Sequence, residues 1–322
     1  MNVDNQSSET DLQQFASEIE ELKLLSHNPN ELSENISEKL RDIVSMLHYI
    51  DILRHSDGHI FKQYLKMIPT DNISSFSEAF SYYPYLETLE GLENWNVSNG
   101  IDFSGMFRDC SSLNSLEGLS HWNVSKGTNF ISMFSRCHSL QSLNGLSHWN
   151  VSNGTIFSYM FNSCDSLVSL EGLSQWNVSN GTNFNDMFCE CKSLESTSAL
   201  YNWNVSKCSK MHEMFVYCES LKDLSGLANW DVSNVHNFVD MFKSCKSLTD
   251  LSPLSHWDVS NGTYFIGMFS ECDLIRDISP LANWTVPKDY DVKDMFIDFD
   301  DNLPKNITKD DIEWLNKNIK RQ

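Results

Sequence analysis

The sequence predicts an α/β repeat fold, a solenoid of stacked coils, because tryptophans, Met-Phe pairs and cysteines all recur with a spacing of 27 residues. The spacing holds without an insertion at Trp95, Trp122, Trp149, Trp176, Trp203, Trp230, Trp257 and Trp284. A unit this short cannot bury its own apolar face, so neighbouring units must stack and share one core. The period is too short for two-helix repeats and falls in the range of about 20–29 residues that leucine-rich repeats occupy. We therefore expect a leucine-rich-repeat-like solenoid.

The chain divides into a repeat array and two flanks without the repeat. We expect a helical N-terminal cap at 1–73, a solenoid of eight to nine repeats at 74–298 and a helical C-terminal cap at 299–322. Residues 11–25 and 31–54 carry apolar side chains at helical intervals, and Thr308 is a candidate N-cap for a helix near the C-terminus. Caps are expected because the open end of a solenoid exposes core and unpaired strand edge.

Within each coil, the WNVSNGT segment has the composition of a turn, because Asn-Gly tolerates positive φ and Asn or Ser side chains bond nearby backbone. The next segment places Phe184, Met187 and Phe188 at the i, i+3, i+4 spacing of one helical face, so we expect a helix of one or two turns. The turn sequence NGTNF changes at 207–211 and at 234–238, and we expect the turn to bulge or loosen there.

The last segment of each coil carries leucines three apart, as at Leu113, Leu116 and Leu119. Its length fits one short strand, and successive strands would pair in parallel about 4.8 Å apart. The expected architecture is thus a narrow parallel β-ribbon on one side of the stack, with short helices and turns on the other.

Two rows of positions beside these leucines vary most between coils. One row comprises Asn114, Gln141, Val168, Glu195, Lys222, Thr249 and Arg276. The other comprises Ser111, His138, Asp165, Lys192, Glu219, Lys246 and Asp273. If the segment is a strand, both rows project from the ribbon like the binding faces of other solenoids. The alternative is that exposed positions without a structural constraint simply drift.

The cysteine pattern favours reduced, buried thiols over disulfides. Seven of the nine cysteines keep the 27-residue spacing, at Cys110, Cys137, Cys164, Cys191, Cys218, Cys245 and Cys272. A small apolar residue that repeats beside Met-Phe and leucine columns belongs in a core. Cys189 and Cys208 break the spacing, and we expect these two thiols to be the more exposed.

Eight asparagines open N-V-S or N-G-T triplets, namely Asn96, Asn123, Asn150, Asn177, Asn204, Asn153, Asn180 and Asn261. Such triplets accept glycans in secreted proteins. Stacked coils would place equivalent asparagines only about 5 Å apart, and Asp231 and Asp258 substitute at this position. Turn formation is therefore the favoured reason for the pattern.

No motif for phosphate binding, nucleophilic catalysis or zinc hydrolysis occurs in the chain, and we expect no cofactor, no metal and no catalytic residues. The net charge of −21 argues against a nucleic-acid groove, which needs a basic footprint. His55 and His59 are four apart, but Asp57-Gly58 between them indicates a loop. His121, His148 and His256 precede tryptophans where other coils have Gln or Asn, which indicates side chains that bond to turn backbone.

The shared pattern WNVSNGTxFxxMFxxCxSLxxLxGL resembles the repeat of BspA-like leucine-rich repeat surface proteins of the mycoplasma lipoprotein type. The coils at Trp230 and Trp257, which read WDVSN, are the most similar, and the resemblance covers about 74–298. It implies surface display, adhesion and protein binding without enzymatic activity.

We therefore expect a non-enzymatic protein-binding scaffold, with a protein partner of unknown identity and a plausible monomeric state. The alternatives are a structural component of a virion or surface layer and, more remotely, an enzyme in the flanking helices. The start of the chain is polar and acidic, unlike a signal peptide, and no apolar stretch approaches the roughly 18 residues of a membrane span. A cytoplasmic location is expected on that basis, whereas the resemblance implies association with a surface or virion.

Overall fold

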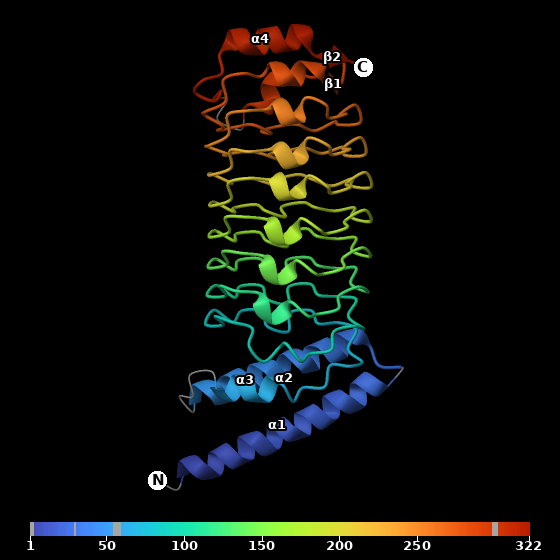
Figure 1. Ribbon diagram of the computed structural model, residues 1–322, viewed down its shortest axis with the longest axis vertical. Coiled ribbons are helices and arrows are strands. Elements are labelled where there is room, and N and C mark those ends of the chain that lie inside the picture. Colours follow the sequence, from blue (N-terminus) through green and yellow to red (C-terminus); the bar gives the residue numbers. More distant parts are fainter. Residues whose placement is uncertain (1–2, 29, 54–58, 298–301) are drawn as a thin grey trace.

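The computed structural model describes residues 3–28, 30–53, 59–297 and 302–322. It is a stack of coils with helices at both ends (Figure 1), so the predicted repeat solenoid is confirmed. A short 3-10 turn recurs in successive coils, as η1 Glu117–Leu119, η2 Asn144–Leu146, η3 Glu171–Leu173, η4 Ser198–Leu200, η5 Ser225–Leu227, η6 Ser252–Leu254 and η7 Ser279–Asn283.

The N-terminal end is formed by α1 (Val3–His27), α2 (Ser33–Leu53) and α3 (His59–Leu65). Side chains of α2 at helical spacing are fully buried, including Leu40, Ile43, Val44 and Leu47. On the other side of the packed surface, Arg41 Nη1 lies 2.7 Å from Glu78 Oε2 and ties α2 to the first coil. The helices thus cover the open end of the core, as a solenoid terminus requires.

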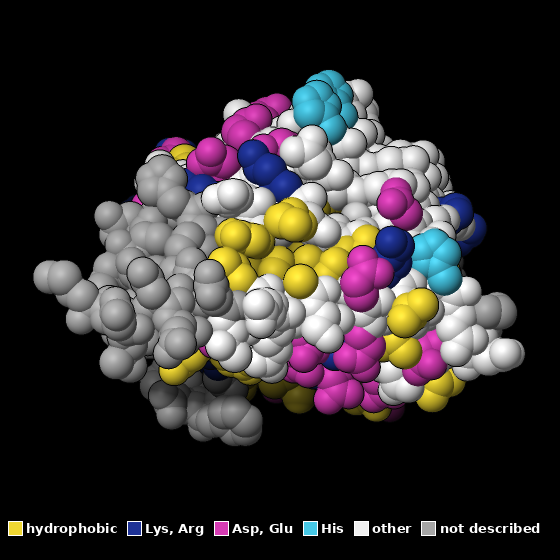
Figure 2. All heavy atoms as spheres, turned by 90° about the horizontal axis from the view of Figure 1, so that it is seen from below, with side chains coloured by type: hydrophobic (Ala, Val, Ile, Leu, Met, Phe, Trp, Pro, Cys, Tyr) yellow, Lys and Arg dark blue, Asp and Glu magenta, His cyan; other side chains and the backbone are white. Residues whose placement is uncertain are grey.

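This helical end also exposes apolar side chains. Figure 2 looks onto it and shows hydrophobic side chains across the middle of the face, with acidic and basic ones around them. Four side chains here are more than half exposed, namely Leu24, Leu32, Tyr49 and Met67. Among the helices that the structure describes, none combines the length and the apolar character needed to cross a membrane.

The C-terminal end contains η8 (Val292–Met295), β1 (Thr285–Val286), α4 (Lys309–Asn318) and β2 (Lys320–Arg321). The two strands pair in parallel, Thr285 with Lys320 and Val286 with Arg321, so β2 continues the stack beyond the last coil. The backbone N–H of Asp311 donates to Thr308 Oγ1 at 3.2 Å, and Asp311 accepts in return from the Thr308 backbone. The expected N-cap is therefore present.

The helix expected at Phe184, Met187 and Phe188 is not formed. Asp186 and Glu190 have φ of 56° and 60°, left-handed values that a helix does not contain. Alternate N–H groups instead donate to the next coil, from Phe184 to Lys210 O (2.9 Å), Asp186 to His212 O (3.1 Å), Phe188 to Met214 O (3.0 Å) and Glu190 to Val216 O (2.7 Å). A run of tight turns therefore brings the three apolar side chains inward, and their spacing imitates that of a helix.

The strand expected at Leu113, Leu116 and Leu119 is also absent as a continuous ladder, because the segment ends in the 3-10 turn η1. A spacing of three suits a 3-10 turn, whereas a strand alternates with a period of two. The parallel bridges lie mainly in the preceding segment, along a column at Ser75, Asp102, Asn129, Ile156, Asn183, Lys210, Asn237 and Tyr264. One bridge, Ser196 to Asp223, lies on the leucine side.

The predicted columns of identical side chains are confirmed. The ring centroids of Trp149 and Trp176 are 6.4 Å apart and their planes differ by 3°. Met160 and Phe161 have no exposed surface. Each tryptophan Nε1 donates to a leucine carbonyl 30 residues earlier, as Trp176 does to Leu146 at 3.0 Å. Each coil is thus joined to its neighbours by ring stacking and by a buried hydrogen bond.

All nine cysteines are free and buried. In the regular column the thiol donates to a phenylalanine carbonyl of the previous coil, as Cys164 Sγ does to Phe134 O at 3.3 Å. The expectation that Cys189 and Cys208 are exposed is wrong, because they retain only 7% and 0% of their surface. Burial raises the pKa of both thiols to about 12, so neither is a reactive thiolate at neutral pH.

Cys208 is buried because it occupies a position that is glycine in most coils. A Cβ on Gly181 would lie 2.3 Å from Cζ of Phe184, so glycine makes room for the ring. In the coil with Cys208 the ring is replaced by Met211, which is unbranched and adaptable. The turn does not loosen as expected, since the amides of Cys208 and Val235 still donate to the residue three earlier, at 2.8 and 2.9 Å.

The asparagines of the N-V-S and N-G-T triplets serve turns. Asn150 Oδ1 accepts from the backbone N–H of Ser152 at 3.1 Å, and Asp258 does the same for Ser260 at 3.0 Å. Asn153 Nδ2 donates to a carbonyl of the preceding coil at 2.8 Å. The interpretation of these residues as turn formers is confirmed, and aspartate substitutes because the acceptor oxygen is what the turn uses.

Candidate functional site

The more variable of the two predicted rows lies on the surface in every coil. All seven side chains are exposed, at Asn114, Gln141, Val168, Glu195, Lys222, Thr249 and Arg276. The backbone brings them into line, because the amide of Asn114 donates to Glu87 O at 3.1 Å and that of Lys222 to Glu195 O at 3.1 Å. The row therefore begins one coil earlier than predicted, at Glu87.

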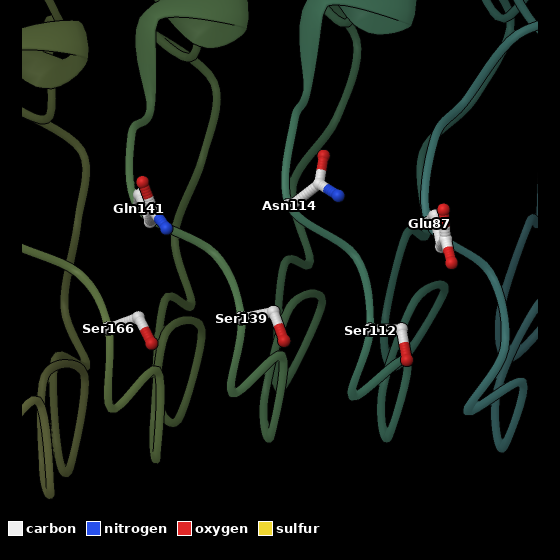
Figure 3. Close-up of a pocket in the computed structure, with 6 residues that line it drawn as sticks. All are labelled: Glu87, Ser112, Asn114, Ser139, Gln141 and Ser166. Atoms are coloured by element: carbon white, nitrogen blue, oxygen red, sulfur yellow. The ribbon is translucent and has the colours of Figure 1, made fainter.

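A shallow groove of about 450 Å³ follows this row in the first coils. It is lined by Glu87, Asn114 and Gln141 from the variable row and by Ser112, Ser139 and Ser166 from a parallel row (Figure 3). Among the residues that the structure describes, the three serine hydroxyls have no hydrogen-bond partner. The groove thus presents hydroxyl, amide and carboxylate groups that are free to bind a ligand.

Sequence reasoning missed the serine row. It continues through Ser193, Ser220 and Ser247, each 27 residues after the last. Its constancy looked like scaffold, and the backbone does use it: Ser139 N donates to Ser111 O at 3.1 Å. The signal that could have found it is that a small polar residue stays constant at a position whose side chain is not buried.

The second predicted row forms a ladder of paired charges. His138 Nδ1 lies 2.9 Å from Asp165 Oδ2, and Lys192 Nζ lies 3.2 Å from Asp165 Oδ1. Two more pairs follow, Lys246 Nζ with Glu219 Oε1 at 2.8 Å and Lys305 with Asp273. The hydrogen bond from Asp165 raises the pKa of Lys192 above its usual value. Such surface pairs contribute little stability, but they leave this row with few charges free for a partner.

Charge is distributed differently along the variable row. Lys222 Nζ pairs with Glu195 Oε2 at 2.7 Å, which neutralises the centre. For Glu87 and Arg276, at opposite ends of the row, no ion pair is found within the described ranges. Val168, between them, leaves 48% of its side chain exposed. The row therefore has an acidic end, a mainly uncharged middle and a basic end.

The histidine candidates do not form a chemical site in the structure. His121, His148 and His256 are exposed, and no hydrogen bond from their side chains is found in the described part of the chain, so the expected bonding to turn backbone is wrong. His55 and the side chain of His59 lie outside the residues whose placement is described. No cluster of three or more His, Cys, Asp or Glu side chains that could hold a metal ion occurs among the described residues.

Comparison with known proteins places the repeat array in a family. Neither the curated proteins nor the solved structures contain a match to this chain. A family model described as "Mycoplasma protein of unknown function, DUF285" matches three overlapping segments, residues 53–169, 141–227 and 194–310. Together these segments cover well over half of the sequence and include every regular coil. The chain therefore belongs to this mycoplasma-type repeat family.

Proposed function

We propose that the protein is a non-enzymatic binding scaffold that holds an extended segment of a protein partner against the variable row and the adjacent serine row. The observation that carries this proposal is the contrast between a backbone that repeats without an insertion and a row of exposed side chains that differs in every coil. A rigid face is pre-organised, so little ordering of the scaffold opposes binding.

The dimensions of the face suit an extended segment. From Glu87 to Arg276 the row spans seven coil spacings, on the order of 34 Å at about 4.8 Å each. A strand-like peptide of about ten residues has this length at about 3.3 Å per residue. The serine hydroxyls and the Asn114 and Gln141 amides can bond to its main chain, whatever its sequence.

The end charges give the bound segment a direction. A basic side chain would lie near Glu87 and an acidic one near Arg276, because complementary charge steers encounter and fixes register. The exposed Val168 provides an apolar contact at the middle of the face. The partner segment is thus amphoteric, with its charges at opposite ends.

A matched pair of double variants tests the face. Asn114→Ala with Gln141→Ala should weaken binding of a captured partner by at least about tenfold, equivalent to about 1.4 kcal/mol. His148→Ala with Gln175→Ala, also exposed and one coil apart, should leave the affinity unchanged. Calorimetric titration measures both, and circular dichroism checks that the coils remain. Equal affinities for the two double variants would refute the assigned face, as would unchanged capture by the chain with Lys222, Thr249 and Arg276 all replaced.

The finer family assignment is part of the proposal. We assign the repeat to the BspA-like leucine-rich type, which implies surface display and adhesion. The pattern WDVSN at Trp230 and Trp257 supports this assignment. Antibody labelling of intact cells, compared with permeabilised cells, distinguishes display from the cytoplasmic location that the polar start of the chain suggests. Labelling only after permeabilisation would exclude display.

The second candidate function is a structural role in a larger assembly, which the exposed apolar side chains at the helical end favour (Figure 2). In that case the chain should self-associate at high concentration, and Leu24→Ser should reduce the association because Leu24 is 73% exposed. Light scattering after size exclusion measures the mass. A monomer at all concentrations for both chains would contradict self-assembly through this end.

A further inference from the structure

A second feature, remote from the proposed binding face, is a column of acidic side chains in the middle coils. Asp186, Glu213 and Asp240 follow one another at the 27-residue spacing, at a position that is Gly105, Ser132 and Tyr159 in the preceding coils. All have left-handed φ, and the backbone links the first two coils where Asp186 N donates to His212 O at 3.1 Å. Carboxyl groups are therefore stacked one coil apart.

Asp186 is the buried member of this column. Its side chain is only 6% exposed, and its Oδ2 atom is buried without a hydrogen-bond partner among the described residues. An ionised carboxylate without a paired cation is costly in such a place. The position of Asp186 therefore calls for a neutral carboxyl group or for a bound cation.

The groups that face Asp186 do not provide a positive charge at neutral pH. The Tyr159 hydroxyl, from the preceding coil, donates to the Asp186 carboxylate, and Cys189, from its own coil, has a thiol whose pKa is raised to about 12. From the following coil, His212 Nε2 lies 3.9 Å from Asp186 Oδ2, but burial lowers the pKa of this histidine. Lys210 acts on His212, whose pKa its charge lowers further.

Glu213 completes the arrangement, since its carboxylate lies within hydrogen-bonding reach of Asp186. Two carboxyl groups in contact favour a state in which one proton lies between them, because only then does one group donate and the other accept. We propose that Asp186 and Glu213 share one proton, and that this proton locks the two middle coils together and is released at alkaline pH.

The pH range follows from the burial and from the charge of Glu213, which together raise the pKa of Asp186 to about 7. In the unfolded chain this carboxyl titrates near the ordinary value of about 3.9. Between these values the folded chain holds a proton that the unfolded chain has lost, so stability falls as the pH rises from about 4 to about 7. Above that range the full cost of the buried charge remains.

Urea unfolding of the full chain at pH 5 and pH 8.5 tests the proposal. Asp186→Asn should leave the urea midpoint unchanged at pH 5 and raise it above that of the wild type at pH 8.5. The matched control is Asp223→Asn: Ser196 and Ser225 donate to Asp223 and lower its pKa despite partial burial, so this variant should lose the same stability at both pH values. Parallel pH dependence of Asp186→Asn and the wild type would overturn the proposal.

Two further measurements separate a shared proton from a merely structural role. The carboxyl carbon resonance of Asp186 should titrate near neutral pH in the wild type and several units lower in Glu213→Gln. Exchange of the Asp186 amide should rise with pH more steeply than that of Ser132, whose amide donates to Ser158 O at 3.0 Å in a coil without these acids. Titration of Asp186 below pH 5, or stabilisation of the wild type but not Asp186→Asn by Ca²⁺ at pH 8.5, would overturn the shared proton.

Discussion

Replacing Trp176 by alanine is expected to lower the free energy of unfolding by about 3–5 kcal/mol. The ring is 3% exposed, and it stacks on Trp149 and Trp203 at centroid distances of 6.4 and 6.5 Å. Alanine would leave a cavity between two coils, remove both stacking contacts and delete the bond from Nε1 to the Leu146 carbonyl. Because each coil contacts only its neighbours, the defect would weaken the stack where it cannot be bypassed.

Urea denaturation followed by tryptophan fluorescence and circular dichroism measures this loss. Gln175→Ala is the matched control, since Gln175 precedes the tryptophan and its side chain is exposed. The control should change stability by less than about 0.5 kcal/mol. A loss below about 1 kcal/mol for Trp176→Ala would contradict the view that the tryptophan column stabilises the stack.

The second large effect is expected from Gly172→Ala, which should cost about 1–3 kcal/mol or more by overpacking. A Cβ at Gly172 would lie 2.0 Å from the carbonyl oxygen of Leu143 and 2.3 Å from its carbon. These are backbone atoms of the preceding coil, so no side-chain rotation relieves the clash and the two coils must separate. Glu171→Ala, one residue away and exposed, is the control and should be nearly neutral.

The natural variation in this glycine column supports the same reasoning. Ala199, Pro253 and Pro280 occupy it in three other coils, and the 3-10 turns that contain them approach the preceding turn less closely than η3 approaches η2. A larger residue is thus tolerated where the coils are already further apart. Thermal unfolding of Gly172→Ala with an unchanged midpoint would show that every interface has this freedom.

The repeat, the buried columns and the helical ends could be predicted from the sequence because they depend on spacing alone. Trp149 and Trp176 lie 27 residues apart in a chain without insertions, and only stacking lets units of this size bury such rings. The exposure of Asn114 and Gln141 followed for the same reason, since they vary beside invariant leucines. The sequence does not contain the local path of the backbone between these columns.

Only the tertiary structure decided how the backbone of each coil turns and which polar groups meet. Phe184, Met187 and Phe188 have helical spacing, yet their amides bond to the next coil, a partner that no local pattern reveals. Cys208 is buried because Met211 replaces a ring, a compensation between two columns. The groove at Ser112 and the contact between Asp186 and Glu213 arise between residues about 27 positions apart, where the distance across the coil interface, rather than residue type, determines whether polar groups pair, repel or remain free.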